Sequence, residues 1–219
     1  MRRIYLDNNS TTPIDPLVSQ AMHEAQEQFP ANPSSQHAEG RQAKARLRDA
    51  CDAILRQVGG DPGSHPPDRL ILTSGGTESN NLAMRGWIPT SRARVIVSVV
   101  EHPSVLQVAL LLQAGGCEIA FAPVDSRGIV DLAELANLLE FPTQLVSVQW
   151  ANHETGIIQP VSEISRLCRA RNALFHSDAV QAVGKVPVRF REAGIDALTL
   201  APHKFHGPRG VGCLLIRAG

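Results

Sequence analysis

Seven short runs rich in β-branched and other apolar residues alternate with segments of helical character between residues 70 and 217. The apolar runs are LILT (70–73), VIVSVV (95–100), EIAFAPV (118–124), QLVSVQW (144–150), ALFHSDA (173–179), ALTLA (197–201) and GCLLIR (212–217). The segments between them that can form helices are ESNNLAMRGW (78–87), SVLQVALLLQAGG (104–116), DLAELANLLE (131–140) and VSEISRLCRARN (161–172). Strand–helix alternation of this kind is typical of an α/β sheet. We therefore expect a seven-stranded, mostly parallel sheet with helices on both faces.

The two ends of this region refine the expectation. The link between the last two runs is too short for a helical crossover, which predicts that GCLLIR runs antiparallel. Before the first run, apolar residues such as Leu47, Ile54 and Val58 recur at helical spacing, and Gly59-Gly60 ends the pattern. A further helix is therefore expected within 41–60, followed by a loop rich in proline and glycine.

Composition excludes several classes of function. The 219 residues carry 21 basic and 21 acidic side chains, so a nucleic-acid or anionic-membrane surface is not expected. No apolar run is long enough to span a bilayer, and the start, MRRIYLDNN, lacks the apolar core of a secretory leader. The four cysteines form no CxxC pair, which favours reduced thiols over a disulfide framework or zinc site. We expect a soluble, cytoplasmic protein.

Polar clusters follow several of the expected strands, where α/β sheets bind their ligands. In TSGGTESNN, a glycine turn opens a helix, and backbone N–H groups near Gly76 with the Thr77 hydroxyl can bind an anion. The alternative is an ordinary helix start with Glu78 in its first turn. The motif lacks GxxxxGK[ST] and GxGxxG, which favours the phosphate of a small cofactor over a nucleotide.

Two further strand ends carry candidate ligand-binding side chains. His102 either caps the next helix or places its imidazole over a flat cofactor ring, where it could also move protons. Asn152, just beyond the 144–150 strand, has an amide that can donate to a phenolic oxygen. His153 and Glu154 are interpreted as a loop ion pair without a catalytic role.

Asp178 and Lys204 are the residues with the most specific chemistry. Asp178 ends an apolar strand, where its carboxylate needs a partner: a helix N-terminus, or the protonated pyridine nitrogen of pyridoxal phosphate (PLP). Lys204 follows a core strand between His203 and a glycine-containing turn, so burial and His203 are expected to lower its pKa. The alternatives are a surface lysine, or a metal site at His203 and His206 that lacks further ligands.

Seven motifs together resemble the NifS/IscS-type cysteine desulfurases of the class V aminotransferase family, which are fold-type I PLP enzymes. In chain order they are YLDNNSTTPIDP, NPSSQHAEGRQAK, TSGGTESNN, EHPSV, ANHETGIIQPV, HSDAVQAVGK and HKFHGPRGVG, and the resemblance covers essentially the whole chain.

The resemblance implies a role for each matching residue. Lys204 would form the covalent bond to PLP, and Asp178 would pair with the pyridinium nitrogen. His102 would stack on the ring and act as acid and base, while Asn152 and Gln181 would contact the phenolic oxygen. The positions that match phosphate-binding residues are Gly76, Thr77 and His203.

The chain departs from the family pattern in two ways. Ala201 stands where the family usually has a phosphate-binding serine, a loss of order 1 kcal/mol of binding if nothing replaces it. Family members also continue into a smaller C-terminal domain that supplies the sulfur-accepting cysteine, a substrate-binding arginine and a phosphate contact across the dimer. We expect residues 1–20 to be an N-terminal segment, 21–219 to be the PLP-binding large domain, and the small domain to be absent. The residues interpreted as packing thiols are Cys51, Cys117, Cys168 and Cys213.

The implied activity is conversion of L-cysteine to L-alanine, with sulfur passed to an enzyme cysteine as persulfide for iron–sulfur or thio-cofactor assembly. A homodimer and a sulfur-acceptor or scaffold protein are the implied partners. The alternatives are selenocysteine lyase or another class V aminotransferase, a non-catalytic PLP-binding fragment or subunit, and a phosphate-binding α/β protein that does not use PLP.

Overall fold

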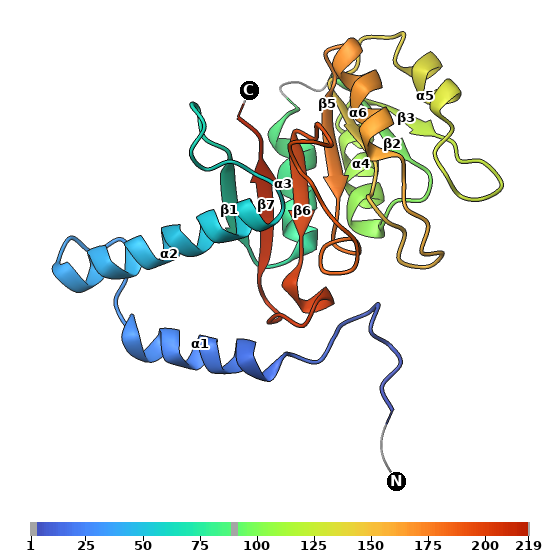
Figure 1. The fold of residues 1–219 in the computed structure, drawn as a ribbon. Helices are drawn as coiled ribbons and strands as arrows, with labels where there is room; N and C mark the ends of the chain where they lie inside the picture. Colours follow the sequence, from blue (N-terminus) through green and yellow to red (C-terminus); the bar gives the residue numbers. More distant parts are fainter. Residues whose placement is uncertain (1–3, 89–91, 219) are drawn as a thin grey trace.

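A single mixed sheet runs through the middle of the molecule (Figure 1). The computed structural model describes residues 4–88 and 92–218. Within these residues, seven strands stand side by side in the order β1-β7-β6-β5-β4-β2-β3. Their bounds are β1 Arg69–Thr73, β2 Arg94–Ser98, β3 Glu118–Ala122, β4 Leu145–Ser147, β5 Leu174–Asp178, β6 Ala197–Leu200 and β7 Gly212–Ile216. Each strand lies within or beside a predicted run, and the α/β class is confirmed.

The strand β7 runs antiparallel to both of its neighbours, whereas the other described pairings are parallel. In the β6–β7 pair, Leu200 lies opposite Cys213 and Ala197 lies opposite Ile216. The short link between these strands therefore reverses the chain at one edge of the sheet, as predicted. This link contains the 3-10 turn η1, Pro202–Lys204, so Lys204 is held where β6 ends.

Helices cover both faces of the sheet, and the side chains of β2 show how the two faces differ. Val95 and Val97 belong to a buried cluster with Met84 of the helix α3 (Gly76–Gly86), while Ile96 between them belongs to a second cluster with Ile164 of the helix α6 (Val161–Ala170). Successive side chains of a strand point to opposite faces, so this alternation separates the two layers. The helices α3 and α4 (Pro103–Ala114) lie on one face, and α2 (Ala38–Gln57), α5 (Leu132–Leu138) and α6 lie on the other.

Five of the described α-helices coincide with segments predicted to be helical. Their bounds are α2 Ala38–Gln57, α3 Gly76–Gly86, α4 Pro103–Ala114, α5 Leu132–Leu138 and α6 Val161–Ala170. Local signals set their starts: the Asp131 carboxylate, for example, accepts from the first free N–H groups of α5, those of Ala133 and Glu134, at 2.9 and 3.1 Å. None of the described helices is both long and apolar enough to cross a membrane.

The helix α1, Pro16–Gln28, was not expected from the sequence patterns. Asp15 caps it by accepting from the Leu17 N–H at 2.7 Å, and proline at the first position is a further start signal. None of its described residues is buried, and Leu17 is 75% exposed. Figure 1 shows α1 apart from the sheet. The boundary expected after residue 20 falls inside this helix.

The buried carboxylate of Asp68 joins three distant segments at the edge of the sheet near β1. Its Oδ2 accepts from Arg191 Nε and from the Asp61 N–H, both at 2.7 Å, and its Oδ1 accepts from the Ala218 N–H at 3.0 Å. Burial alone would raise the pKa of Asp68, but these hydrogen bonds outweigh it and hold the pKa below its ordinary value.

Replacing Asp68 by asparagine should lower the free energy of unfolding at pH 7 by about 1–3 kcal/mol, because an amide cannot accept from all of these donors. Folding depresses the Asp68 pKa, so its contribution is complete above the unfolded-chain pKa of about 3.9. This contribution to stability is lost as the pH falls through the pKa that Asp68 has in the folded state, which is lower than in the unfolded chain. Urea unfolding at pH 7 and below pH ~4 should therefore show a difference from wild type that shrinks in acid.

The matched control is Glu163→Gln, which removes a carboxylate whose partner Arg166 lies at the surface. That change should stay within about 0.5 kcal/mol. Equal stability of Asp68→Asn and wild type at pH 7 would contradict the assigned role of Asp68.

Candidate active site

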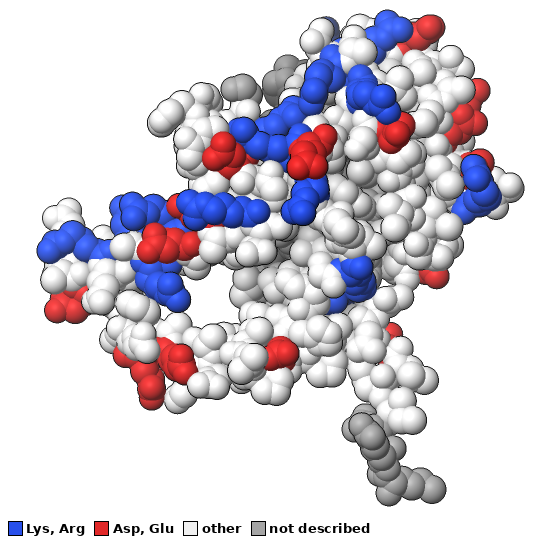
Figure 2. Space-filling view, in the orientation of Figure 1, with Lys and Arg blue, Asp and Glu red and all other residues white. Residues whose placement is uncertain are grey.

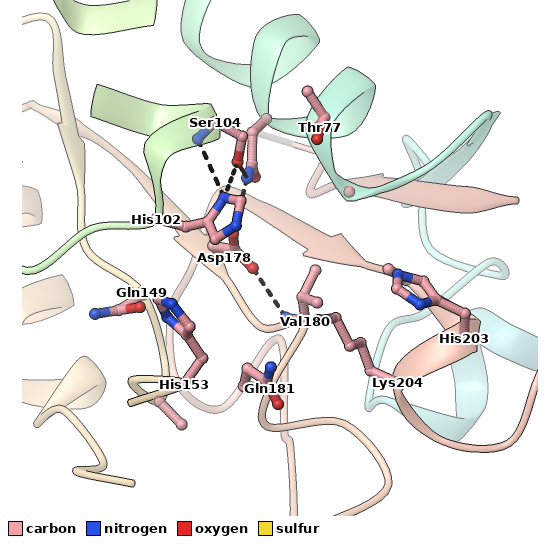
Figure 3. A pocket seen from close by; sticks show the side chains of 14 residues that line it. Thr77, His102, Ser104, Gln149, His153, Asp178, Val180, Gln181, His203 and Lys204 are labelled. Carbon is pink, nitrogen blue, oxygen red and sulfur yellow. Dashed lines mark hydrogen bonds between the residues drawn. The ribbon is translucent and has the colours of Figure 1, made fainter. Parts of the chain in front are cut away.

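A cavity of about 250 Å³ opens at the carboxyl edge of the parallel strands (Figure 3). Its lining includes Thr77 from the start of α3, His102 from the start of α4, Asp178 from the end of β5 and Lys204 from the turn after β6. Parallel strands end at the same edge of a sheet, so side chains far apart in sequence meet here. Sites for drug-sized ligands hold roughly 300–1,000 Å³, so this cavity suits a smaller molecule.

Asp178 places a buried carboxylate in the wall of the cavity. Only 7% of the residue is exposed. Its Oδ1 accepts from the Val180 N–H at 2.9 Å, and its Oδ2 accepts from Asn80 Nδ2 at 2.7 Å. Burial raises the pKa of Asp178, and these hydrogen bonds, together with the nearby His102 and Lys204, oppose the rise. The carboxylate is therefore suited to a cationic group in the cavity.

Asn80 and Ser104 were missed as site residues by the sequence analysis. Asn80 is 1% exposed, and its Nδ2 donates to Ser104 Oγ at 2.9 Å as well as to Asp178. Its Oδ1 is buried and has no hydrogen-bond partner among the described residues. Asparagine is a poor helix former, so its place in α3 directly after the Ser-Gly-Gly-Thr turn was an available signal.

His102 both caps α4 and lines the cavity, so the two interpretations of its motif hold together. Its Nδ1 accepts from the Ser104 N–H at 3.1 Å and lies 2.7 Å from Ser104 Oγ. Burial lowers the His102 pKa, the Asp178 carboxylate opposes this, and His153 and Lys204 add to the lowering. The lowered pKa favours the neutral form of the ring. His153, also in the cavity wall, meets it edge-on with ring centroids 5.5 Å apart.

Lys204 directs its amine to the rim of the cavity, where Nζ donates to the backbone oxygen of Asn9 at 2.6 Å. Burial lowers the Lys204 pKa, the ammonium of Lys185 lowers it further, and Asp178 and Asp7 act in the opposite direction. The sequence predicted burial correctly, but the neighbouring cation is Lys185 rather than His203. A lowered pKa raises the fraction of unprotonated, nucleophilic amine.

The N-terminal segment lies across the lysine turn, a contact that the sequence analysis did not predict. Besides Lys204, the backbone oxygen of Asn9 accepts from Gln181 Nε2 at 2.9 Å, and Asn9 Nδ2 donates to the His153 oxygen at 3.1 Å. The Thr12 N–H donates to the His203 oxygen at 2.8 Å. Residues separated by nearly the whole chain therefore hold the rim together.

Gly76, Thr77 and His203 lie together at the end of the cavity nearest α3. Among the described residues, no side chain caps this helix, so its first N–H groups can bind an anion. A Cβ on Gly76 would lie 3.0 Å from a Val180 methyl carbon, so the turn has little room for a side chain. These three residues also line an adjoining cavity together with Arg209, a cation that the sequence analysis did not single out. Ala201 contributes a buried methyl group and no hydroxyl.

The structure places Gln181 in the cavity wall and Asn152 outside it. Asn152 Nδ2 donates to the Val100 oxygen at 3.2 Å, and its Oδ1 accepts from the Glu154 and Thr155 N–H groups at 2.9 and 2.8 Å. Its amide therefore holds the 152–155 loop, and its contact with a cofactor stays a prediction. His153 Nε2 and Glu154 Oε1 lie 3.7 Å apart, close enough for the expected loop ion pair.

None of the four thiols lines the cavity. Cys117, Cys168 and Cys213 are buried, and Cys51 is partly buried on α2. Burial raises the pKa of Cys168 to about 12 and that of Cys213 to about 11. These thiols are poor nucleophiles, in agreement with their interpretation as packing residues.

The comparison with known proteins places these features in one family. The family model for aminotransferase class-V matches residues 4–219. The cysteine desulfurase IscS of Dictyoglomus turgidum is 41% identical over 221 residues, and the alignment covers 100% of this chain and 55% of that protein. A cysteine desulfurase of Klebsiella pneumoniae is 42% identical over 219 residues, with coverage of 100% and 54%. This chain thus spans about half the length of these relatives.

Solved structures agree. A NifS-like protein superimposes with a TM-score of 0.91 at 35% identity, covering 100% of this chain and 60% of the other. A structure described as SspA in complex with cysteine has a TM-score of 0.89 at 29% identity, covering 97% and 61%. The match of the family model to nearly the whole chain, together with these relatives and structures, shows that the chain belongs to the aminotransferase class-V family.

Proposed function

We propose that this chain is the PLP-binding portion of a cysteine desulfurase, which converts L-cysteine to L-alanine and passes the sulfur to an enzyme cysteine as persulfide. The observation that carries the proposal is the meeting of an amine, a buried carboxylate, an imidazole and an anion-binding turn in one small cavity. The curated relatives, which are cysteine desulfurases at about 40% identity, support the choice of reaction.

The residues of the cavity fit PLP. The buried Asp178 carboxylate suits a protonated pyridine nitrogen, because a cationic partner offsets the cost of burying the charge. The uncapped start of α3, with Thr77 and His203, suits the phosphate. Lys204 would supply the amine for the covalent bond. When bound, PLP supplies an electron sink that stabilises negative charge at the substrate α-carbon.

The side chains around the cavity would bind the substrate and move its protons. The Lys204 amine would act as the base that moves a proton of the bound substrate. The flat imidazole of His102 would pack over the ring. Gln181 reaches the cavity directly, whereas Asn152 would have to exchange its hydrogen bond to Val100 to reach a phenolic oxygen.

The sulfur acceptor in this proposal is a cysteine of the further length that the relatives have, because none of the four thiols lines the cavity. The persulfide would then supply iron–sulfur or thio-cofactor assembly through an acceptor or scaffold protein. A cytoplasmic location is supported by the four free cysteines.

We also propose that the full protein is a homodimer. Large apolar side chains are exposed on the N-terminal segment and α1, including Leu6 at 86% and Leu17 at 75%. Figure 2 shows few charged side chains on the near face of α1. Such a surface supports a covered position in the complete assembly. Sedimentation of the full-length protein should give the mass of two chains, and a monomer at micromolar concentration would contradict the proposal.

The wild-type chain, after addition of PLP and removal of the unbound cofactor, should keep an absorbance near the visible edge. Borohydride reduction followed by peptide mapping should place the cofactor on Lys204. Lys204→Ala should lose the retained absorbance and the modified peptide, because no other amine in the cavity wall can replace it. Lys44→Ala, at an exposed position of α2, is the matched control and should behave as wild type. Cofactor on another lysine, or a colourless wild-type protein, would contradict the proposal.

The loaded chain should change its absorbance on addition of L-cysteine in excess, because the substrate amine would compete with Lys204 for the cofactor in the cavity. It should release no alanine from L-cysteine, since no described thiol lines the cavity to accept the sulfur as persulfide. Alanine released from L-cysteine and from L-selenocysteine, and formation of keto acids, should be measured side by side. A marked preference for selenocysteine, or a keto-acid product, would instead favour the lyase or transaminase alternatives.

A further inference from the structure

A chain of buried hydrogen bonds connects Asp178 to His102 through two residues with no role in the proposed function. Asp178 Oδ2 accepts from Asn80 Nδ2 at 2.7 Å, the same nitrogen lies 2.9 Å from Ser104 Oγ, and Ser104 Oγ lies 2.7 Å from His102 Nδ1. Asn80 is 1% exposed and Ser104 is 9% exposed, so water competes little with these contacts. Figure 3 shows Ser104 and His102 side by side above Asp178.

The chemistry of the donors fixes where each proton lies. The amide nitrogen of Asn80 has two protons and accepts none, so it donates both to the Asp178 carboxylate and to Ser104 Oγ. If the Asn80 amide were turned by about 180°, its oxygen would face the Asp178 carboxylate, and neither group could donate a hydrogen bond to the other. The Ser104 oxygen thus accepts a hydrogen bond from Asn80, and its own hydroxyl proton is free to point at His102 Nδ1.

His102 Nδ1 meets a second donor as well. The backbone N–H of Ser104 lies 3.1 Å from the same nitrogen, as the cap of α4. A proton on Nδ1 would face the backbone N–H of Ser104 and break that hydrogen bond, and it would force the Ser104 hydroxyl to reverse from donor to acceptor. A proton on Nε2 leaves both contacts with Ser104 in place, because Ser104 contacts the ring at Nδ1.

We propose that Asn80 and Ser104 are positioning residues that hold His102 as the neutral imidazole with its proton on Nε2. The ring then presents an N–H donor at Nε2 and can accept a proton only at the nitrogen that Ser104 covers. In this arrangement the residue that pairs with a cationic ligand, Asp178, also orients the ring through Asn80. The importance of this tautomer for the reaction rests on the proposed function, whereas the positions of the protons on Asn80, Ser104 and His102 do not.

The tautomer can be measured directly on the chain without cofactor. Histidine labelled with ¹⁵N gives two-bond ¹H–¹⁵N correlations that distinguish a protonated from an unprotonated ring nitrogen, and His102→Gln identifies the resonances of His102 by their loss. We expect an unprotonated Nδ1 and a protonated Nε2 at a pH where the ring is neutral. A proton on Nδ1, or a comparable mixture of tautomers, would overturn the proposal.

Variants test whether Asn80 and Ser104 are responsible. In Ser104→Ala and Asn80→Ala, the fraction of His102 rings with a proton on Nδ1 should rise. The protonation constant of His102 should increase by roughly threefold to tenfold, which corresponds to the loss of one hydrogen bond. Ser104→Thr keeps the hydroxyl and should restore the wild-type values. The control Asn81→Ala alters the neighbouring asparagine, which donates to the Thr77 oxygen and not to this chain of bonds.

The other titratable groups that act on His102 are kept in all four variants: Asp178 of β5, His153 of the loop after β4, and Lys204. Unchanged tautomer and titration in Ser104→Ala would overturn the proposal, even if Asn80→Ala does not fold. Because these measurements use no PLP, they can succeed where the cofactor proposal fails, and they can fail although PLP binds.

Discussion

Burial of the Asp178 carboxylate is the constraint on which the rest of the site depends. A charge in this position costs free energy unless donors surround it, and the chain provides Asn80, the Val180 N–H and the nearby Lys204. Each of these three groups comes from a different element, so the helix α3 and the turns after β5 and β6 have defined positions relative to one another. The Asp178 carboxylate also lines the cavity, where a protonated ring nitrogen of PLP would supply a further positive charge beside it.

The antiparallel β7 determines how Lys204 reaches this carboxylate. A parallel strand would require a long crossover after β6, which would carry the lysine away from the edge. The reversal keeps Lys204 next to the end of β6, and the N-terminal segment then holds the turn through Asn9 and Thr12. The short connection and the distant segment act together, and the amine is placed at the rim with Lys185 nearby to lower its pKa.

Much of the site could be predicted because strand ends can be read from sequence periodicity, and because the resemblance of seven motifs to the class V aminotransferases implied roles for the matching residues. Of the eight predicted site residues, seven line the cavity, and Asn152 lies outside it because its amide is engaged by its own loop. Asn80 and Ser104 were missed, since a buried hydrogen bond depends on the relative placement of two helices. The helix α1 was missed for another reason: its apolar residues have no core partner among the described residues, so tertiary burial gives no support to its weak pattern.

The sequence by itself determined the seven described strands, five of the described α-helices, the antiparallel last strand and the chemistry available at each strand end, because these depend on local spacing and on the length of links. It also contained the seven ordered motifs of the class V aminotransferases. Only the tertiary structure decided which polar groups meet: that Asn9 holds Lys204, that Lys185 is its neighbouring cation, and that Asn80 joins Asp178 to Ser104 and His102. The physical reason is that such contacts are a few ångströms long and involve residues far apart in the chain, so no local pattern specifies them.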